Sequence, residues 1–188
     1  NDPTPVTNMT AFTLEALVNP AAKKNNSILS TIMGIEGKFL VRLGDDYLSW
    51  NQIQVVWDSG SYDYYGRPVE GKLSNINMTI NANEWSHIAV TFGEKTIKVY
   101  VNGVEKGSST TNVPSSVNFG IAHNDEQGTR ITRCFWVGYS YEHARYFPGM
   151  MSELRIWNRV LTADELANAT RRYGVDPKSE GLVTYWKC

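Results

Sequence analysis

The sequence has few cysteines, no long apolar run and almost no net charge. It has two cysteines, Cys134 and Cys188, in 188 residues. This excludes a disulfide framework, but it leaves open either one bridge or a buried free thiol at Cys134. No apolar run approaches the ~20 residues of a membrane span. The net charge is −1 and no Lys/Arg run occurs, so we expect neither membrane insertion nor nucleic-acid binding.

Catalytic motifs are also missing. The sequence contains no Gly-x-Ser-x-Gly, His-Glu-x-x-His or Cys-x-x-Cys segment. Retaining glycosidases need two carboxylates ~5–5.5 Å apart, which on one strand means an even spacing such as Glu-x-Asp-x-Glu. Glu15 and Glu153 are lone strand carboxylates without such a partner. We expect no enzymatic activity, and a glycoside hydrolase with unrecognised carboxylates remains the least favoured alternative.

Short apolar runs separated by turn residues fill most of the chain, which also holds six Trp and ten Tyr. This pattern predicts about a dozen strands. We expect them at residues 12–18, 28–33, 38–43, 53–57, 73–80, 84–92, 96–101, 104–108, 118–122, 134–139, 151–157 and 181–186. Asn102-Gly103 between alternating runs is a strong hairpin signal. Residues 58–68 have no clear periodicity and predict a long exposed loop.

One segment has a helical pattern. Thr162 and Glu165 form a capping box at the start of a helix expected over residues 163–173, and Gly174 is placed to end it. Many strands and one late helix predict an all-β, two-sheet antiparallel sandwich of the jelly-roll kind, with one short helix near the C-terminus. We expect residues 1–188 to be a single domain, with a linker at residues 1–10, that is either a mature protein or an excised piece of a larger one.

Four segments, in order along the chain, carry a family likeness. They are residues 12–18 (FTLEALV), 84–92 (EWSHIAVTF), 99–103 (VYVNG) and 147–166 (FPGMMSELRIWNRVLTADEL). Together they resemble the laminin G-like jelly-roll domains of the concanavalin A-like lectin/glucanase superfamily, known from bacterial secreted and surface proteins. The likeness departs at Leu17, where the family usually has Trp, and in the Tyr-rich segment 58–68. It implies a secreted or cell-surface location and a carbohydrate or protein partner, in some members bound through calcium. It also implies structural roles for Glu15, His87 and Glu153, which fall at motif positions of the non-catalytic domains.

Two Tyr-rich segments are the candidate ligand-binding sites, because aromatic rings stack on sugars and polar neighbours bond their hydroxyls. The candidate residues are Tyr62, Asp63, Tyr64, Tyr65 and Arg67, and, in the second segment, Tyr139, Tyr141 and Arg145 together with Tyr146. The alternative is that these tyrosines pin long loops onto the sandwich edge. Whether the two segments meet stays open.

Acidic turns are the candidate calcium ligands, since calcium takes six to eight oxygens, mostly from loops. Asp45 and Asp46 lie in one predicted turn, and Asp125 and Glu126 in another. The alternative is that they are solvated turn residues. The sequence predicts no obligatory cofactor and leaves calcium binding open.

We therefore expect a non-catalytic, lectin-like module that binds carbohydrate or acts in adhesion. The alternative is a structural spacer or a protein-interaction domain. The expected partner is accordingly a glycan, either a polysaccharide or a glycoprotein sugar, or else a protein.

Overall fold

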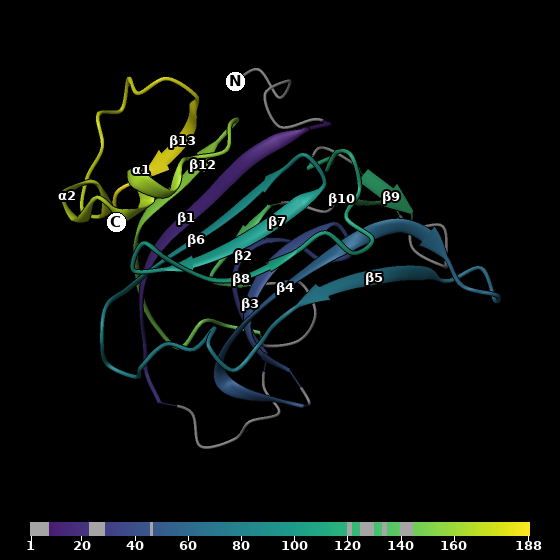
Figure 1. Ribbon diagram of the computed structural model, residues 1–188. Helices are drawn as coiled ribbons and strands as arrows, with labels where there is room; N and C mark the ends of the chain where they lie inside the picture. The colour runs from purple at the N-terminus through teal and green to yellow at the C-terminus, as the bar shows by residue number, and fades with distance from the viewer. Residues whose placement is uncertain are drawn as a thin grey trace.

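The computed structural model describes residues 8–22, 29–45, 47–119, 122–124, 130–132, 135–139 and 145–188. For residues 122–124 and 130–132 it describes the backbone alone. Within these ranges the chain forms two antiparallel sheets, which face each other as the two layers of a sandwich (Figure 1). This confirms the expected all-β, two-sheet jelly-roll architecture.

The first sheet has six strands in the order β13-β12-β1-β6-β7-β8. Their bounds are Leu182–Trp186, Gly149–Trp157, Ala11–Pro20, Ser86–Gly93, Thr96–Val101 and Val104–Ser109. The second sheet has five strands in the order β11-β2-β3-β4-β5. Their bounds are Trp136–Val137, Ser30–Ile35, Phe39–Asp45, Leu48–Tyr62 and Pro68–Leu73. A two-stranded ribbon pairs β9 (Ala122–Asn124) with β10 (Arg130–Thr132).

Phenylalanines from both sheets meet in the core. The Phe12 ring lies 4.9 Å from Phe39, 4.8 Å from Phe92 and 5.1 Å from Phe119, measured between ring centroids. All four are buried, and each buried ring of this size stabilises the fold by roughly 1.5–3 kcal/mol. Met9 joins the same core, so the described part of the expected linker packs with the domain.

The β7–β8 hairpin follows the sequence prediction closely. β7 has the expected bounds, and Asn102 and Gly103 form its turn with φ of 51° and 80°. Two successive positive φ values are what a type I′ turn requires, and its twist matches that of the flanking strands. This hairpin sets the edge of the six-stranded sheet.

The predicted loop at 58–68 is wrong. β4 runs on to Tyr62 and pairs with β5 through Asp58–Glu70, Ser61–Val69 and Tyr62–Pro68, so only residues 63–67 form the turn. The pairing shifts register between Asp58 and Ser61, and the outer end of the hairpin is exposed. A bulge interrupts the alternation of apolar and polar residues. The exposed outer end also has no buried face that would require apolar residues at every second position, so the sequence shows no period-two pattern there.

Three other strand predictions need correction. Of the strand expected at 73–80, only Leu73 is strand, as the last residue of β5, and Thr79 makes one bridge with Gln52. The chain turns instead, since Asn75 accepts hydrogen bonds from the N–H groups of Asn77 and Met78. Of the strand expected at 118–122, residues 118–119 are not strand, Ala122 belongs to β9, and residues 120–121 lie outside the described residues. Of the strand expected at 134–139, Trp136–Val137 is extended and paired, while Cys134 lies outside the described residues. Cys188 is an exposed free cysteine.

The single predicted helix is two short ones, α1 (Ala163–Ala167) and α2 (Ala169–Arg172). The capping box at Thr162 and Glu165 is confirmed. The helix breaks at Asn168, which has an extended backbone and accepts hydrogen bonds from the N–H groups of Thr170 and Arg171. An Asn side chain that caps a new helix competes with continuation of the old one.

The two helices lie on the outer face of the six-stranded sheet (Figure 1). Leu161 and Leu166 pack there with Ala89, Tyr100 and Trp157 in a second, smaller core. No helix among the described residues has the length and apolar character to cross a membrane.

Candidate functional site

The tip of the β4–β5 hairpin is organised by one carboxylate. Asp63 Oδ1 accepts hydrogen bonds from the backbone N–H groups of Tyr65 and Arg67, both at 2.9 Å, and Oδ2 accepts from Arg67 Nε at 2.8 Å. The Arg67 backbone bond is the main reason that the pKa of Asp63 lies below its usual value. Gly66, with φ of 74°, completes the turn. The tip is therefore an ordered turn held by its own side chains.

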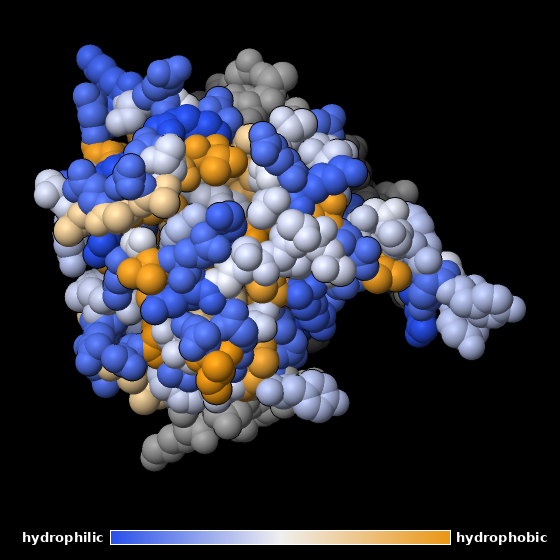
Figure 2. All heavy atoms as spheres, in the orientation of Figure 1, coloured by the Kyte–Doolittle hydropathy of each residue, from blue (hydrophilic) through white to orange (hydrophobic). Residues whose placement is uncertain are grey.

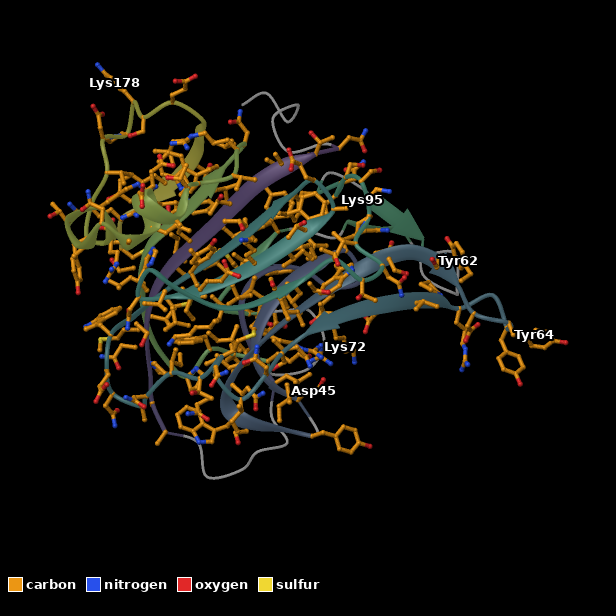
Figure 3. The ribbon with its side chains drawn as sticks, viewed as in Figure 1. Asp45, Tyr62, Tyr64, Lys72, Lys95 and Lys178 are labelled. Atoms are coloured by element: carbon orange, nitrogen blue, oxygen red, sulfur yellow. The ribbon has the colours of Figure 1, made fainter. Side chains whose placement is uncertain are left out.

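Three tyrosines project from this tip into solvent. Their exposed fractions are 71% for Tyr62, 95% for Tyr64 and 77% for Tyr65. Tyr64 sits at the far end of the hairpin (Figure 3), and the tip stands away from the rest of the surface (Figure 2). These exposures contradict the alternative that the tyrosines at 62–65 pin a loop to the sandwich.

The rings at the tip do not form a flat platform. Tyr64 and Tyr65 are 5.3 Å apart and nearly perpendicular, at 85°. The Arg67 guanidinium lies 5.1 Å from the centre of the Tyr65 ring, a cation–π arrangement. The tip thus offers one ring face, one ring edge and one cation within a few residues.

The second aromatic group lies at the β11 edge of the five-stranded sheet. Tyr139 and Tyr146 are 4.8 Å apart and tilted by only 31°, and Trp136 meets Tyr139 edge-on at 5.1 Å. Tyr146 is 60% exposed, whereas Trp136 and Tyr139 are half-buried. Tyr141 lies outside the described residues.

The predicted ligand residue Arg145 is engaged within the protein. Its guanidinium donates to Glu36 Oε1 at 2.6 Å, and its backbone carbonyl accepts from the Thr31 N–H at 3.0 Å. Glu36 was not foreseen from the sequence, because nothing in a β-turn between two apolar strands marks a residue as the partner of an arginine far along the chain.

The structure keeps Tyr62 and Tyr139, one from each Tyr-rich segment, apart. β11 and β4 are separated by β2 and β3. The hairpin tip lies beyond Trp57, at the end of the sheet where β2 turns into β3. Tyr139 follows Val137, which pairs with Met33, and so lies toward the opposite end. The question left open by the sequence is settled for Tyr62 and Tyr139: they belong to separate sites.

Of the four acidic residues predicted to bind calcium, only Asp45 is described. Its Oδ2 lies 3.0 Å from the Arg42 guanidinium and 3.8 Å from Lys72 Nζ, and Figure 3 shows Asp45 and Lys72 as neighbours. Asp46, Asp125 and Glu126 have no described side chains. Within the described part of the chain, no group of three or more His, Cys, Asp and Glu side chains could hold a metal ion. Calcium binding stays a prediction.

The two strand carboxylates are buried in a charge network beneath the helices. Glu15 has no exposed surface and contacts His87 at 3.0 Å, Arg171 at 3.0 Å and Trp157 Nε1 at 2.5 Å. Burial alone would raise its pKa, but the hydrogen bonds and charges of His87 and Arg171 outweigh burial and hold it at about 2. The structural role predicted for Glu15 is confirmed.

Glu153 is equally committed to the fold. It is 3% exposed, forms an ion pair with Arg155, and accepts a hydrogen bond from the Tyr185 hydroxyl at 2.6 Å. Neither carboxylate can reach a substrate in solvent.

A groove of about 780 Å³ crosses the outer face of the six-stranded sheet near the β6–β7 turn. Lys95, Lys98 and Arg159 line it. Two of these cations already have carboxylate partners, since Lys98 lies 3.0 Å from Glu105 and Arg159 lies 2.7 Å from Glu165. The groove is therefore a weaker candidate for a charged ligand than its lining indicates.

Comparison with known proteins identifies the family to which this fold belongs. The family model described as the concanavalin A-like lectin/glucanases superfamily matches residues 1–167. No match to a curated protein was found. A solved protein from Bacteroides ovatus, to which carbohydrate binding is ascribed, has a TM-score of 0.69 and 28% identity over 96% of this chain. This chain spans only 46% of that protein's length.

Two more distant structures share the fold alone. Domain 4 of AbnA, a GH43 extracellular arabinanase from Geobacillus stearothermophilus solved with arabinotriose, has a TM-score of 0.55 and 20% identity, covering 88% of this chain and 68% of that one. The heptameric SAP-like pentraxin of Limulus polyphemus has a TM-score of 0.58 and 15% identity, covering 96% and 78%. From the family match and the two-sheet architecture together, the chain belongs to the concanavalin A-like lectin/glucanases superfamily.

Proposed function

We propose that this chain is a non-catalytic carbohydrate-binding module of a secreted or cell-surface protein, and that the tip of the β4–β5 hairpin contacts the glycan. The observation that carries the proposal is the exposure of Tyr62, Tyr64 and Tyr65 on a turn that Asp63 holds in place. Exposed aromatic residues cost a protein solubility, so three on one ordered turn indicate a binding role.

The chemistry of the tip suits a sugar. A pyranose presents an apolar face of C–H groups and a rim of hydroxyls, so a tyrosine face stacks on the first, and phenol hydroxyls and the exposed Arg67 guanidinium bond the second. The tip also needs little ordering on binding, since its turn is already fixed by hydrogen bonds, and preorganisation lowers the entropic cost of association.

Two of the similar structures add support. The Bacteroides ovatus protein is ascribed carbohydrate binding, and the arabinanase domain was solved with arabinotriose. The non-catalytic part of the proposal rests on Glu15 and Glu153, which are buried and ion-paired, so neither is available as an acid, a base or a nucleophile.

A protein partner is the second candidate, and one observation favours it. The tip places two tyrosines beside an arginine, and Tyr and Arg are among the residue types that contribute most binding energy at protein–protein interfaces. We favour a glycan because the tip is a narrow projecting hairpin without a surrounding flat surface (Figure 2). Stable protein interfaces bury roughly 800 Å² per partner, which requires a broader surface than this tip offers.

A glycan array tests the proposal, probed with the wild-type chain and the double variant Tyr64→Ala/Tyr65→Ala. Tyr47→Ala is the matched control, because Tyr47 is 97% exposed but precedes β4, at its other end. We expect saturable binding that the double variant loses and the control keeps. An array that is blank for the wild type, or equal binding by the double variant, contradicts the proposal.

The same array run with calcium and with a chelator tests the calcium prediction. A signal that disappears with the chelator would show that glycan binding requires calcium and would make Asp45 and Asp46 candidate ligands at the other end of β4. An unchanged signal would restrict the site to the aromatic tip.

A further inference from the structure

A small pocket lies at the base of the β4–β5 hairpin. Its volume is about 150 Å³, and its walls come from four separate segments of the chain. The polar residues that line it are Asn8, Lys38, Asp58, Gly60, Ser116 and Asn118. None of these residues was singled out from the sequence, because they come together only in the folded sandwich.

One wall is fixed by a short β-bridge. Met9 and Val117 exchange backbone hydrogen bonds of 2.8 and 2.9 Å, which places Asn8 beside Asn118. The Asn118 amide donates to Asn8 Oδ1 at 3.2 Å. Asn8 has a left-handed backbone, with φ of 52°, which Asn tolerates better than most residues. The two amides are therefore held at the pocket in a defined orientation.

The opposite wall is an ion pair. Lys38 Nζ lies 2.6 Å from Asp58 Oδ2, and the Asp58 N–H donates to the Lys38 carbonyl at 3.0 Å. Asp58 Oδ1 accepts from the Gly60 N–H at 2.9 Å. Burial raises the pKa of Asp58, but the hydrogen bonds from Lys38 and Gly60 outweigh it and leave the pKa below its usual value. The carboxylate thus stays ionised at neutral pH.

The lining determines the class of ligand. Carboxylate and amide oxygens accept hydrogen bonds, and ammonium and amide N–H groups donate them, while Pro114 and Val117 add apolar surface. Lys38 and Asp58 cancel in charge, so the pocket favours neither a cation nor an anion. Hydroxyl groups, which both donate and accept, suit such a lining best.

The size of the pocket limits the ligand further. About 150 Å³ is roughly half of the smallest cavities that hold drug-sized molecules, about 300 Å³. One sugar ring is the hydroxyl-rich group of matching size, whereas an oligosaccharide would have to extend out of the pocket.

The pocket and the exposed tyrosines lie on the same strand. Gly60 lines the pocket and Tyr62 follows two residues later in β4, about 7 Å along an extended strand. A glycan with one residue in the pocket can therefore continue toward the hairpin tip.

We propose that this pocket binds a single uncharged sugar residue through its hydroxyl groups, as the anchoring subsite of a glycan whose next residues contact the tip tyrosines. The proposal rests on the proposed function for the identity of the ligand. It adds a second contact region to the site. It also predicts that the pocket recognises one sugar unit independently of the tip tyrosines.

The test is an NMR titration of the ¹⁵N-labelled chain with L-arabinose, D-glucose, D-galactose, D-mannose and N-acetyl-D-glucosamine, one at a time. We expect at least one of them to shift the amide signals of Gly60, Val117 and Asn118 saturably, at millimolar concentrations. Shifts confined to other residues, or no shifts with any of the five sugars, overturn the proposal.

Two neighbouring serines supply a matched pair of variants. Ser116→Leu fills the pocket, whereas Ser115→Leu makes the same change on the adjacent residue, which lines the separate groove on the six-stranded sheet. Ser116→Leu should abolish the monosaccharide shifts and weaken binding of an array-positive oligosaccharide about tenfold, and Ser115→Leu should do neither. The amide spectra of both variants verify folding.

The outcomes separate this proposal from the proposed function. If an oligosaccharide binds and depends on Tyr64 and Tyr65, but Ser116→Leu has no effect, the pocket assignment fails and the proposed function stands. If the pocket signals shift with a monosaccharide while the tyrosine variants bind normally, the pocket stands and the assignment of the tip fails.

Discussion

The Glu15 carboxylate has no solvent exposure, yet three basic side chains and an indole surround it. A buried charge is tolerated only when its partners replace water, so this network ties β1 and β12 to the helix that follows. The sequence predicts a structural role for Glu15, because Glu15 falls at a motif position of the non-catalytic jelly-roll domains and no second carboxylate shares its strand. It could not identify Arg171, 156 residues away, as a partner.

We predict that Glu15→Gln destabilises the protein by roughly 3 kcal/mol at pH 7. A pKa of about 2 in the folded state, against a usual value near 4.5, corresponds to roughly that stabilisation. Because the folded-state pKa is the lower one, the stabilisation is complete above about pH 4.5 and is lost as the pH falls toward 2. Urea unfolding at a series of pH values measures it.

The difference between wild type and Glu15→Gln should accordingly shrink below pH 4.5. Glu84→Gln, at an exposed carboxylate, is the control and should behave as wild type. A stability difference that stays constant from pH 7 to pH 2.5 would show that the charge of Glu15 does not matter.

A second prediction concerns Gly71, which faces Trp57 across β4 and β5. A Cβ there would lie 2.1 Å from the indole ring, so Gly71→Ala should destabilise the fold by about 1–3 kcal/mol through overpacking. At Gly174 no described atom lies within 4 Å of such a Cβ, and Gly174→Ala should change stability by less than about 0.5 kcal/mol. Equal midpoints of thermal unfolding for the two variants would refute the packing argument.

At the scale of elements, the sequence predicted strands best where one face is buried. β7 alternates cleanly because the Ile97 and Val99 side chains fill the core. The outer half of the β4–β5 hairpin has no core to face, so its sequence pattern predicts a loop where the structure has paired strands. The helical pattern over residues 163–173 likewise gave no sign of the break at Asn168. Asn168 caps α2 without changing the helical spacing of the apolar residues around it.

The cap of α1 gives a prediction at this scale. Thr162→Ala removes the acceptor for the Glu165 N–H and should cost about 1 kcal/mol. Thr170→Ala, inside α2 and exposed, is the matched control, for which we expect a change within about 0.5 kcal/mol. Chemical denaturation of both variants checks it, and a Thr162→Ala protein as stable as its control would show that the cap contributes nothing.

The turn at the hairpin tip gives another. Asp63→Ala removes the acceptor for two backbone N–H groups and for Arg67, so the tyrosines should lose their fixed arrangement. We expect binding of an array-positive glycan to weaken about tenfold, which is 1.4 kcal/mol of binding free energy, while the midpoint of unfolding stays the same. Wild-type affinity in Asp63→Ala would mean that an ordered turn is not needed.

At the scale of the whole molecule, the ordered set of four motifs was enough to predict the two-sheet sandwich. The motifs mark β1, β6, β7 and β12, which are neighbours or near neighbours in the six-stranded sheet. Motifs do not report which surface segments meet. The separation of Tyr62 from Tyr139, the Arg145–Glu36 pair and the pocket at Asp58 all depend on contacts between distant segments.

The central claim is that the tip tyrosines bind a glycan, and isothermal titration calorimetry tests it most directly. The strongest array glycan would be titrated into the wild-type chain, Tyr64→Ala/Tyr65→Ala and the control Tyr47→Ala. We expect the double variant to lose at least about tenfold in affinity, which is 1.4 kcal/mol of binding free energy, and the control to match the wild type. Equal affinities for all three proteins would contradict it.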